Sequence, residues 1–290
     1  MRAEIPHREL RAGGARALAL PAIADAVEDL LARGTLYGWA SAHPERRGLG
    51  GRGEALRVPA PRPGGDGGVW VVRHFVRGGS VAAPLLGDRY LRLGTPRSFA
   101  ELRASERARG RGVRTPRVLA AASYPAGPFR RGDLVTEWLP EAVDLGSALF
   151  GAEGGAAAPG SGGHTGATHA GGSEANVSRM LETAGALVRE LTMAGVEHVD
   201  LNARNVLLRP RDGGLEGWVL DLDRARLHPE AVVSAGARML ARLERSLAKV
   251  AAGAGSGFTV ELRAALRRGA GDLNDALGRD VPRPAAEGAP

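Results

Sequence analysis

The most constraining feature of this sequence is the order of elements in its second half. Residues 176–195 place apolar side chains at steps of three and four, which predicts one long amphipathic helix ended by a glycine. The segment HVDLNARN (198–205) follows at once. Two apolar strands are then predicted at 205–210 and 217–223, around a turn at 212–214. Helix, polar loop, hairpin and a closing acidic pair together predict a functional site beside the hairpin.

The spacing H-x-D-x-x-x-x-N in HVDLNARN is typical of a kinase catalytic loop. Phosphoryl transfer to a hydroxyl needs a group that accepts or orients the hydroxyl proton, ligands for Mg²⁺, and donors for the phosphates. We therefore predict Asp200 as the catalytic base, with Asn205 and Asp221 as metal ligands. Taken alone, Asp200 is equally explained as a helix cap or turn residue. The order of the surrounding elements favours the site.

The acidic pair in WVLDLD leaves two candidates for the second metal ligand, Asp221 and Asp223. We favour Asp221 because it directly follows the apolar strand, which would hold its carboxylate more firmly. Asp223 stands where a kinase usually carries glycine.

Partners for the phosphates are expected upstream. The run VWVVRHFV (69–76) predicts a strand that carries Arg73, and the following helix, predicted at 95–110, carries Glu101. An arginine can donate a fork of N–H groups to phosphate oxygens and can pair with a helical glutamate. A glycine-dense stretch precedes this strand, as a phosphate-covering loop would, and we assign Gly51 and Gly53 to it.

The remaining segments predict an α+β, two-lobed chain. Strands dominate the first half and helices the second, with the boundary after residue 138, so that residues 1–138 form one lobe and 139–290 the other. Residues 151–172 contain nine glycines and six alanines, and we expect a flexible insertion there. The further expected elements are a helix at 21–33, strands at 117–124 and 133–139, and helices at 237–250 and 260–268.

Composition excludes several classes of protein. The chain carries 39 basic residues, of which only Lys249 is a lysine, so 38 are arginines and a Walker A loop with its lysine cannot be built. Cysteine is absent, which excludes disulfides and thiolate metal sites. No apolar run approaches the ~20 residues of a membrane span, and no signal peptide is evident at the start. Aromatic residues are only 4%, so we expect no nucleic-acid partner despite the net charge of +7.

The chain resembles the 3-deoxy-D-manno-octulosonic acid (Kdo) kinases of the lipopolysaccharide kinase family, within the protein-kinase-like superfamily. The segments that carry the resemblance are GRG (51–53), VRHFVRGG (72–79), DRYLRLGTPRSFAE (88–101), HVDLNARNVLL (198–208), WVLDLDRARL (218–227) and RLERSLAKV (242–250). The resemblance implies a protein-kinase-like fold. Its N-lobe would be an antiparallel sheet with one main helix, beside the N-terminal helix, and its C-lobe would be mostly helical.

The resemblance also implies an activity: transfer of the ATP γ-phosphate, with Mg²⁺, to O-4 of Kdo on a lipid A precursor. It implies a peripheral protein at the cytoplasmic face of the inner membrane, in contact with anionic lipid. In this family an arginine, here Arg73, replaces the usual strand lysine, and Glu101 is its partner. The arginines of residues 72–94 are candidates for docking the anionic glycolipid. A heptose kinase, a RIO-like protein kinase, a pseudokinase and a basic binding protein remain the alternatives.

Overall fold

The computed structural model describes residues 6–49, 55–61, 68–75, 90–91, 94–151 and 173–273. Within these ranges, eight strands form one antiparallel sheet in the order β1-β2-β7-β8-β5-β4-β3, with β6 also pairing with β8. The strands are β1 (Arg8–Ala12), β2 (Ala15–Ala19), β3 (Arg47–Gly48), β4 (Ala55–Pro59), β5 (Val69–His74), β6 (Tyr90–Leu91), β7 (Val118–Ala126) and β8 (Phe129–Glu137). We call the chain up to the end of β8 the N-lobe.

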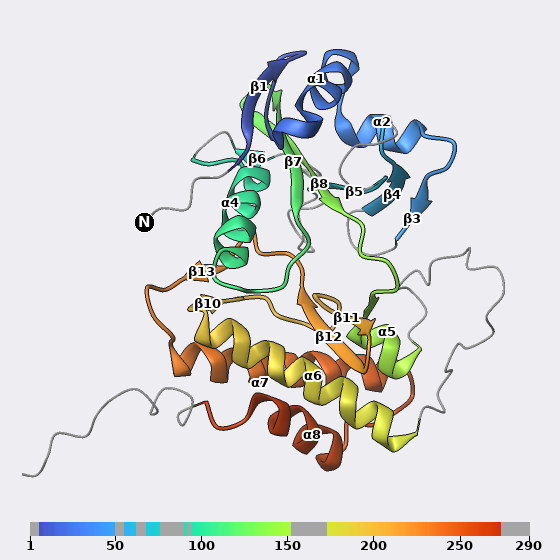
Figure 1. The fold of residues 1–290 in the computed structure, drawn as a ribbon, viewed down its shortest axis with the longest axis vertical. Coiled ribbons are helices and arrows are strands. Elements are labelled where there is room, and N and C mark those ends of the chain that lie inside the picture. The colour runs from blue at the N-terminus through green and yellow to red at the C-terminus, as the bar shows by residue number, and fades with distance from the viewer. Residues whose placement is uncertain are drawn as a thin grey trace, which may run out of the picture.

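Helices cover both faces of the N-lobe sheet. On one face α4 (Arg97–Arg109) buries Phe99 and Leu102 against β7 and β8. On the other face lie α1 (Ala24–Arg33) and α2 (Leu36–Ala42), which follow a short 3₁₀ turn, η1 (Pro21–Ile23). The middle strands are therefore buried on both sides, as Figure 1 shows for β7 between α4 and α1. Trp70 on β5 is the largest side chain in the core that α1 and α2 share with the sheet.

The C-lobe, from β9 onward, is mainly helical and lies below the sheet in Figure 1. Its helix α6 (Glu174–Met193) buries a stripe of leucine, valine and alanine, including Leu181, Leu187 and Leu191. Fully burying each such side chain contributes about 1.5–3 kcal/mol. Around α6 lie α5 (Leu145–Phe150), α7 (Val233–Gly253) and α8 (Val260–Ala270). The small sheets are β9 (Val143–Asp144) with β11 (Val206–Arg211) and β12 (Gly214–Val219), and β10 (Val196–Glu197) with β13 (Arg226–Leu227).

The two lobes are also bonded through the segment between α4 and β7. Arg114 Nη2 donates to both carboxylate oxygens of Glu190 on α6, at 2.7 and 2.9 Å, and its carbonyl accepts from the Val219 amide on β12 at 2.9 Å. Arg111 Nη1 donates to the carbonyls of Ala194 and His228 at 2.8 and 2.7 Å. These contacts fix the C-terminal end of α4 to the lobe that carries the hairpin β11–β12.

The predicted elements are present, with two kinds of difference. The strand expected at 217–223 ends at Val219, because Asp221 has a φ of 63° and extended backbone cannot include it. Four strands that were not predicted, β1 to β4, precede the strand expected at 69–76. The first two strands are alanine-rich or charged (RELRA and ARALA) and lack the β-branched residues that signal a strand.

Candidate active site

His198 holds the catalytic-loop segment and the acidic segment together. Its Nδ1 accepts from the Asp200 amide at 3.2 Å, and its Nε2 donates to the carbonyl of Leu220 at 2.8 Å. The Leu220 amide in turn donates to the Asn205 carbonyl at 2.9 Å. The imidazole is therefore neutral, with its proton on Nε2, and burial lowers its pKa, which keeps it in that form. Through this ring the structure brings Asp200, Asn205 and Asp221 into one site.

The loop itself is held by its own amides and by α7. The Asn202 side chain donates to the Asp200 carbonyl at 2.9 Å and accepts from the Arg204 amide at 3.0 Å. The Ser246 hydroxyl on α7 accepts from the Ala203 amide at 3.1 Å. Asn205 Nδ2 lies 3.4 Å from the Asp200 carbonyl, so its side-chain oxygen has no partner in that contact and is open to a cation.

Asp221 is a backbone outlier placed beside the loop. Together with Glu141, it is one of two non-glycine residues with positive φ in the described ranges. Residues held in this region cost about 1–3 kcal/mol and cluster at functional sites. Its Oδ1 is buried and forms an ion pair with Arg73 Nη1 at 3.2 Å, in a geometry poorly aligned for a hydrogen bond. A carboxylate oxygen in that position keeps lone pairs for a metal ion.

Asp223, two residues later, is engaged differently. Its carboxylate is almost completely buried and is held by both Nε and Nη2 of Arg97, the first residue of α4. Both nitrogens contact the same oxygen, Oδ2, and this pair joins Asp223 in the C-lobe to α4 in the N-lobe. Asp221 therefore remains the better candidate for the metal.

Arg73 and Glu101 complete a chain of charges from α4 to Asp221. The Arg73 guanidinium on β5 bonds Glu101 on α4 through Nη2 and pairs with Asp221 through Nη1. The guanidiniums of Arg73 and Arg97 both lie over the ring of the buried Phe75, 5.0 and 5.4 Å from its centre. Glu101 and Arg97 share one face of α4, so a single helix positions both arginines toward the acidic segment.

Burial and neighbouring charges shift the pKa values of the acidic groups of the site in different directions. Burial opposes ionisation of Asp221, but Arg73 outweighs it and holds the pKa of Asp221 below its ordinary value. Burial and the neighbouring Asp221 raise the pKa of Asp223 despite Arg97. Burial raises the pKa of Glu101 to about 7, against the attraction of Arg73. Of the two aspartates in this segment, Asp221 is therefore the one whose ionised form the surroundings favour, which suits a metal ligand.

Two arginines that the sequence analysis did not single out contact Asp200. Arg224 Nη1 donates to Asp200 Oδ2 at 2.7 Å, and Arg242 Nη1 lies 3.7 Å from Oδ1. In the sequence Arg224 follows the acidic pair directly and Arg242 opens the segment RLERSLAKV, but neither position indicates a contact with Asp200. Arg97 was missed as well. Its partner Asp223 lies 126 positions away in the sequence, so local reasoning could not pair them.

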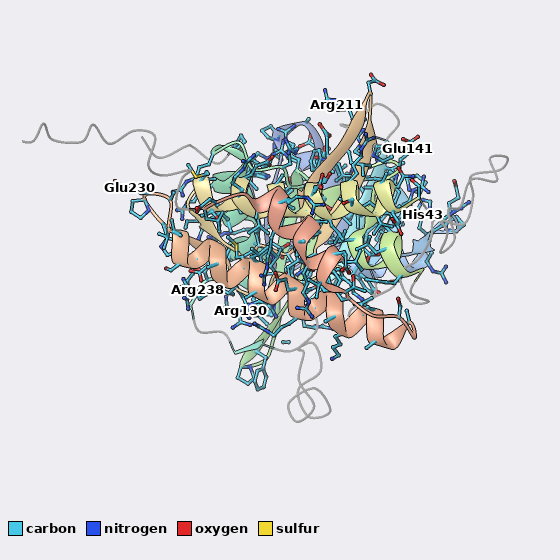
Figure 2. The ribbon with its side chains drawn as sticks, turned by 90° about the horizontal axis from the view of Figure 1, so that it is seen from below. His43, Arg130, Glu141, Arg211, Glu230 and Arg238 are labelled. Carbon is cyan, nitrogen blue, oxygen red and sulfur yellow. The ribbon has the colours of Figure 1, made fainter. Side chains whose placement is uncertain are left out.

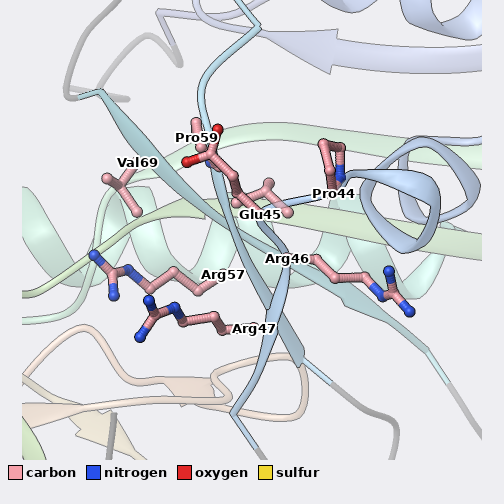
Figure 3. A pocket seen from close by; sticks show the side chains of 8 residues that line it. Pro44, Glu45, Arg46, Arg47, Arg57, Pro59 and Val69 are labelled. Carbon is pink, nitrogen blue, oxygen red and sulfur yellow. The ribbon is translucent and has the colours of Figure 1, made fainter. Parts of the chain in front are cut away.

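The glycines assigned to phosphate binding, Gly51 and Gly53, lie outside the described residues, between β3 and β4. The same is true of most of the predicted docking segment 72–94 and of the insertion. A hollow of about 350 Å³ opens beside β3 and β4, where Arg47 and Arg57 on paired strands extend side by side (Figure 3). None of the predicted site residues lines it. The roles assigned to Asp200, Asn205, Asp221, Arg73 and Glu101 stay predictions.

Comparison with known proteins places the chain. The model of the lipopolysaccharide kinase (Kdo/WaaP) family matches residues 53–158 and 163–262, which include Arg73, Glu101, Asp200, Asn205 and Asp221. The chain belongs to this family.

Curated relatives of this lipopolysaccharide kinase family agree with the assignment. The chain is 34% identical over 205 residues to a 3-deoxy-D-manno-octulosonic acid kinase of Stenotrophomonas maltophilia (strain R551-3), covering 70% of the chain and 69% of the relative. It is 36% identical over 203 residues to one of Xanthomonas euvesicatoria pv. vesicatoria (strain 85-10), covering 69% and 68%. A solved structure described as WaaP in complex with acyl carrier protein has a TM-score of 0.50 at 18% identity, covering 94% of the chain and 92% of that structure.

These findings confirm the protein-kinase-like fold predicted from the sequence. They also establish the chain as a phosphotransferase of lipopolysaccharide kinase type that acts on an alcohol group. Such an enzyme uses ATP, and the site has the parts that this reaction needs: a carboxylate on a loop, an amide and a carboxylate beside it, and an arginine on a central strand.

Proposed function

We propose that this protein transfers the γ-phosphate of ATP to O-4 of a Kdo sugar on a lipid A precursor. The observation that carries the proposal is the bridge that His198 makes between the backbone amide of Asp200 and the backbone carbonyl of Leu220, the residue before Asp221, within a family whose curated relatives are named for Kdo. The imidazole thereby joins the segment that carries the proposed base to the segment that carries the proposed metal ligand.

In the proposed reaction, Asp200 accepts the proton of the sugar hydroxyl. The hydroxyl oxygen forms a bond to the γ-phosphorus, and the bond from that phosphorus to the oxygen bridging the β- and γ-phosphates breaks, so that ADP leaves. Arg73, held by Glu101, donates to the phosphate oxygens. His198 takes no part in proton transfer. Both its nitrogens are engaged with backbone groups, and it positions the two acidic segments.

Asn205 and Asp221 are the residues that would hold Mg²⁺. They fit this ion, because Asp221 Oδ1 is buried without a hydrogen bond and the Asn205 side-chain oxygen is open. Across the described ranges no three His, Asp or Glu side chains gather as a complete protein site. Mg²⁺ in kinases is typically bound by one or two protein oxygens together with phosphates and water. When bound, the ion supplies neutralisation of the phosphate charge.

We further propose that the enzyme works as a peripheral protein at the cytoplasmic face of the inner membrane. No helix in the described part of the chain is long and apolar enough to cross a bilayer. The net charge of +7, carried almost entirely by arginine, supports attraction to anionic lipid.

The decisive test is direct phosphorylation. Purified protein with Mg-ATP and a Kdo-bearing lipid A precursor should give a phosphate on Kdo O-4, located by NMR of the product. Asp200→Asn should lose activity by about a hundredfold or more, because the base is removed while the shape of the loop is kept. A heptose or protein acceptor used in preference, or equal activity of Asp200→Asn, would refute the proposal.

A further inference from the structure

Two exposed arginines, Arg224 and Arg242, each contact one oxygen of the Asp200 carboxylate. Arg224 Nη1 bonds Oδ2 at 2.7 Å, and Arg242 Nη1 pairs with Oδ1 at 3.7 Å. Asp200 is the acidic partner that the structure gives to both arginines. These contacts occupy the side chain that the proposed reaction needs free, because a carboxylate oxygen bonded to arginine is a weaker acceptor for the proton of a hydroxyl. Their place in catalysis therefore needs an explanation.

The main chains of both arginines are fixed, whereas their guanidinium groups are open to solvent. Arg224 follows the buried Leu222 and the paired Asp223, and its side chain is 66% exposed. Arg242 lies one turn before Ser246 on α7, whose hydroxyl binds the loop, and its side chain is 43% exposed. Ion pairs exposed to this degree contribute little to stability. An anion from a ligand can therefore replace Asp200 at low cost.

We propose that Arg224 and Arg242 bind the carboxylate of the acceptor sugar, exchanging Asp200 for it when the substrate enters. This inference rests on the proposed function. In the free protein Asp200 stands where the substrate carboxylate will bind, since it is the same chemical group held by the same two donors. An arginine fork matches a carboxylate in two-point geometry. A sugar acid carries its carboxylate and its hydroxyls on one small molecule, so binding the first group beside Asp200 presents a hydroxyl to it.

The exchange makes recognition and catalysis depend on each other. Without an acidic acceptor both arginines stay on Asp200. With it, they move to the substrate and release the base next to the hydroxyl. A neutral sugar of similar shape would leave Asp200 paired. The enzyme thereby discriminates against acceptors that lack the carboxylate.

The test compares two acceptors: a Kdo-bearing lipid A precursor and the same glycolipid with the Kdo carboxylate converted to a carboxamide. We expect wild type to prefer the acid by about 10- to 100-fold in kcat/KM, the worth of one or two charged hydrogen bonds. Arg224→Met and Arg242→Met should each raise the KM for the acid and abolish most of this preference, with the KM for ATP unchanged.

Arg211→Met is the matched control. Arg211 also forms an exposed ion pair, to Glu216 at 2.6 Å, but at the protruding tip of the β11–β12 hairpin (Figure 2). This variant should keep the full preference for the acid. Far-UV circular dichroism of all three variants checks that they fold.

Several outcomes would overturn the inference. Retention of the preference for the acid in Arg224→Met and Arg242→Met, or an equal loss of turnover on both acceptors, would contradict it. A rise in kcat on both acceptors would show that the arginines only inhibit Asp200. A third acceptor, the Kdo-bearing precursor without its lipid A phosphates, tests the other source of negative charge. If the two variants keep the preference for the carboxylate and lose only a preference for the phosphorylated acceptor, the arginines bind phosphate instead. If wild type phosphorylates neither Kdo acceptor, the proposed function fails, and this inference falls with it.

Discussion

At the scale of single residues, the two aspartates of LDLD show how identical side chains take different roles in different surroundings. Asp221 has a left-handed backbone, a buried oxygen that is paired with Arg73, and a lowered pKa. Asp223 is held by two nitrogens of Arg97 and has a raised pKa. The surroundings therefore favour the ionised form of Asp221, whereas Asp223 joins the lobes.

Substitution should separate these roles. Asp221→Asn should lower Mg²⁺-dependent turnover by about 100-fold or more, because it removes the charge that holds the ion. Asp223→Asn should keep part of the turnover. It should cost about 1–3 kcal/mol of unfolding free energy, because Arg97 loses its buried partner. Urea unfolding and a Mg²⁺ titration of the rate measure both; the reverse ranking of the two variants in activity would refute the assignment.

Glu101 makes the free energy of unfolding depend on pH. An unfolded chain releases this proton near the ordinary pKa of 4.5, whereas the folded protein keeps it up to about pH 7. The folded state binds more protons within that window, so the free energy of unfolding falls as pH rises through it. Glu101→Gln does not titrate. The melting temperature of the variant relative to wild type should therefore rise between about pH 5 and about pH 8.

Activity should rise with pH over the range in which stability falls. The ionised form of Glu101 holds Arg73 most firmly, so kcat/KM for ATP in wild type should rise as pH passes through about 7. Glu101→Gln should be less active throughout and should lose this rise. A variant with an unchanged acid limb would show that another group controls it.

At the scale of elements, α6 and α8 cross so closely that glycine is required on both. A Cβ at Gly185 would lie 2.0 Å from the carbonyl oxygen of Leu266, and one at Gly269 would lie 1.9 Å from that of Glu182. Either alanine would force the helices apart. Because α8 covers the C-lobe core through Ala265 and Leu266, we expect each substitution to cost about 1–3 kcal/mol.

Urea unfolding of Gly185→Ala and Gly269→Ala measures this cost. Gly253 offers the control, since it ends α7 and a Cβ there meets nothing within 4 Å. Gly253→Ala should be neutral or slightly stabilising, because alanine restricts the unfolded chain. Equal stability of all three variants would mean that the helices shift apart without loss.

The elements that the sequence predicts well are those with a strong local period. The stripe of α6 follows from apolar residues at steps of three and four, and the hairpin β11–β12 from two apolar runs around a turn, and with them comes the place of Asp200. Short segments without such a period were missed, among them β2 with its sequence ARALA. Contacts between distant segments were out of reach too. Nothing near Arg97 indicates Asp223, and nothing near Arg224 shows that it turns toward Asp200.

At the scale of the whole molecule, the site depends on both lobes being held together. Arg97 and Arg73 reach from the N-lobe to the acidic segment, while Arg111 and Arg114 fasten the far end of α4 to the C-lobe. Both ends of α4 are therefore tied to the lobe that carries Asp200. This helix therefore positions the charged residues of the candidate site as much as the loop does.

The charge of the whole chain predicts how the enzyme meets its substrate. With a net charge of +7, it should bind vesicles that contain anionic phosphatidylglycerol and should ignore neutral phosphatidylcholine vesicles. Screening shortens from about 10 Å at 0.1 M salt to about 3 Å at 1 M, so co-sedimentation with the anionic vesicles should fall steeply over that range. Binding that persists at high salt, or that is equal on neutral lipid, would contradict an electrostatic attachment. It would indicate an apolar anchor instead, because burial of apolar surface does not weaken with salt.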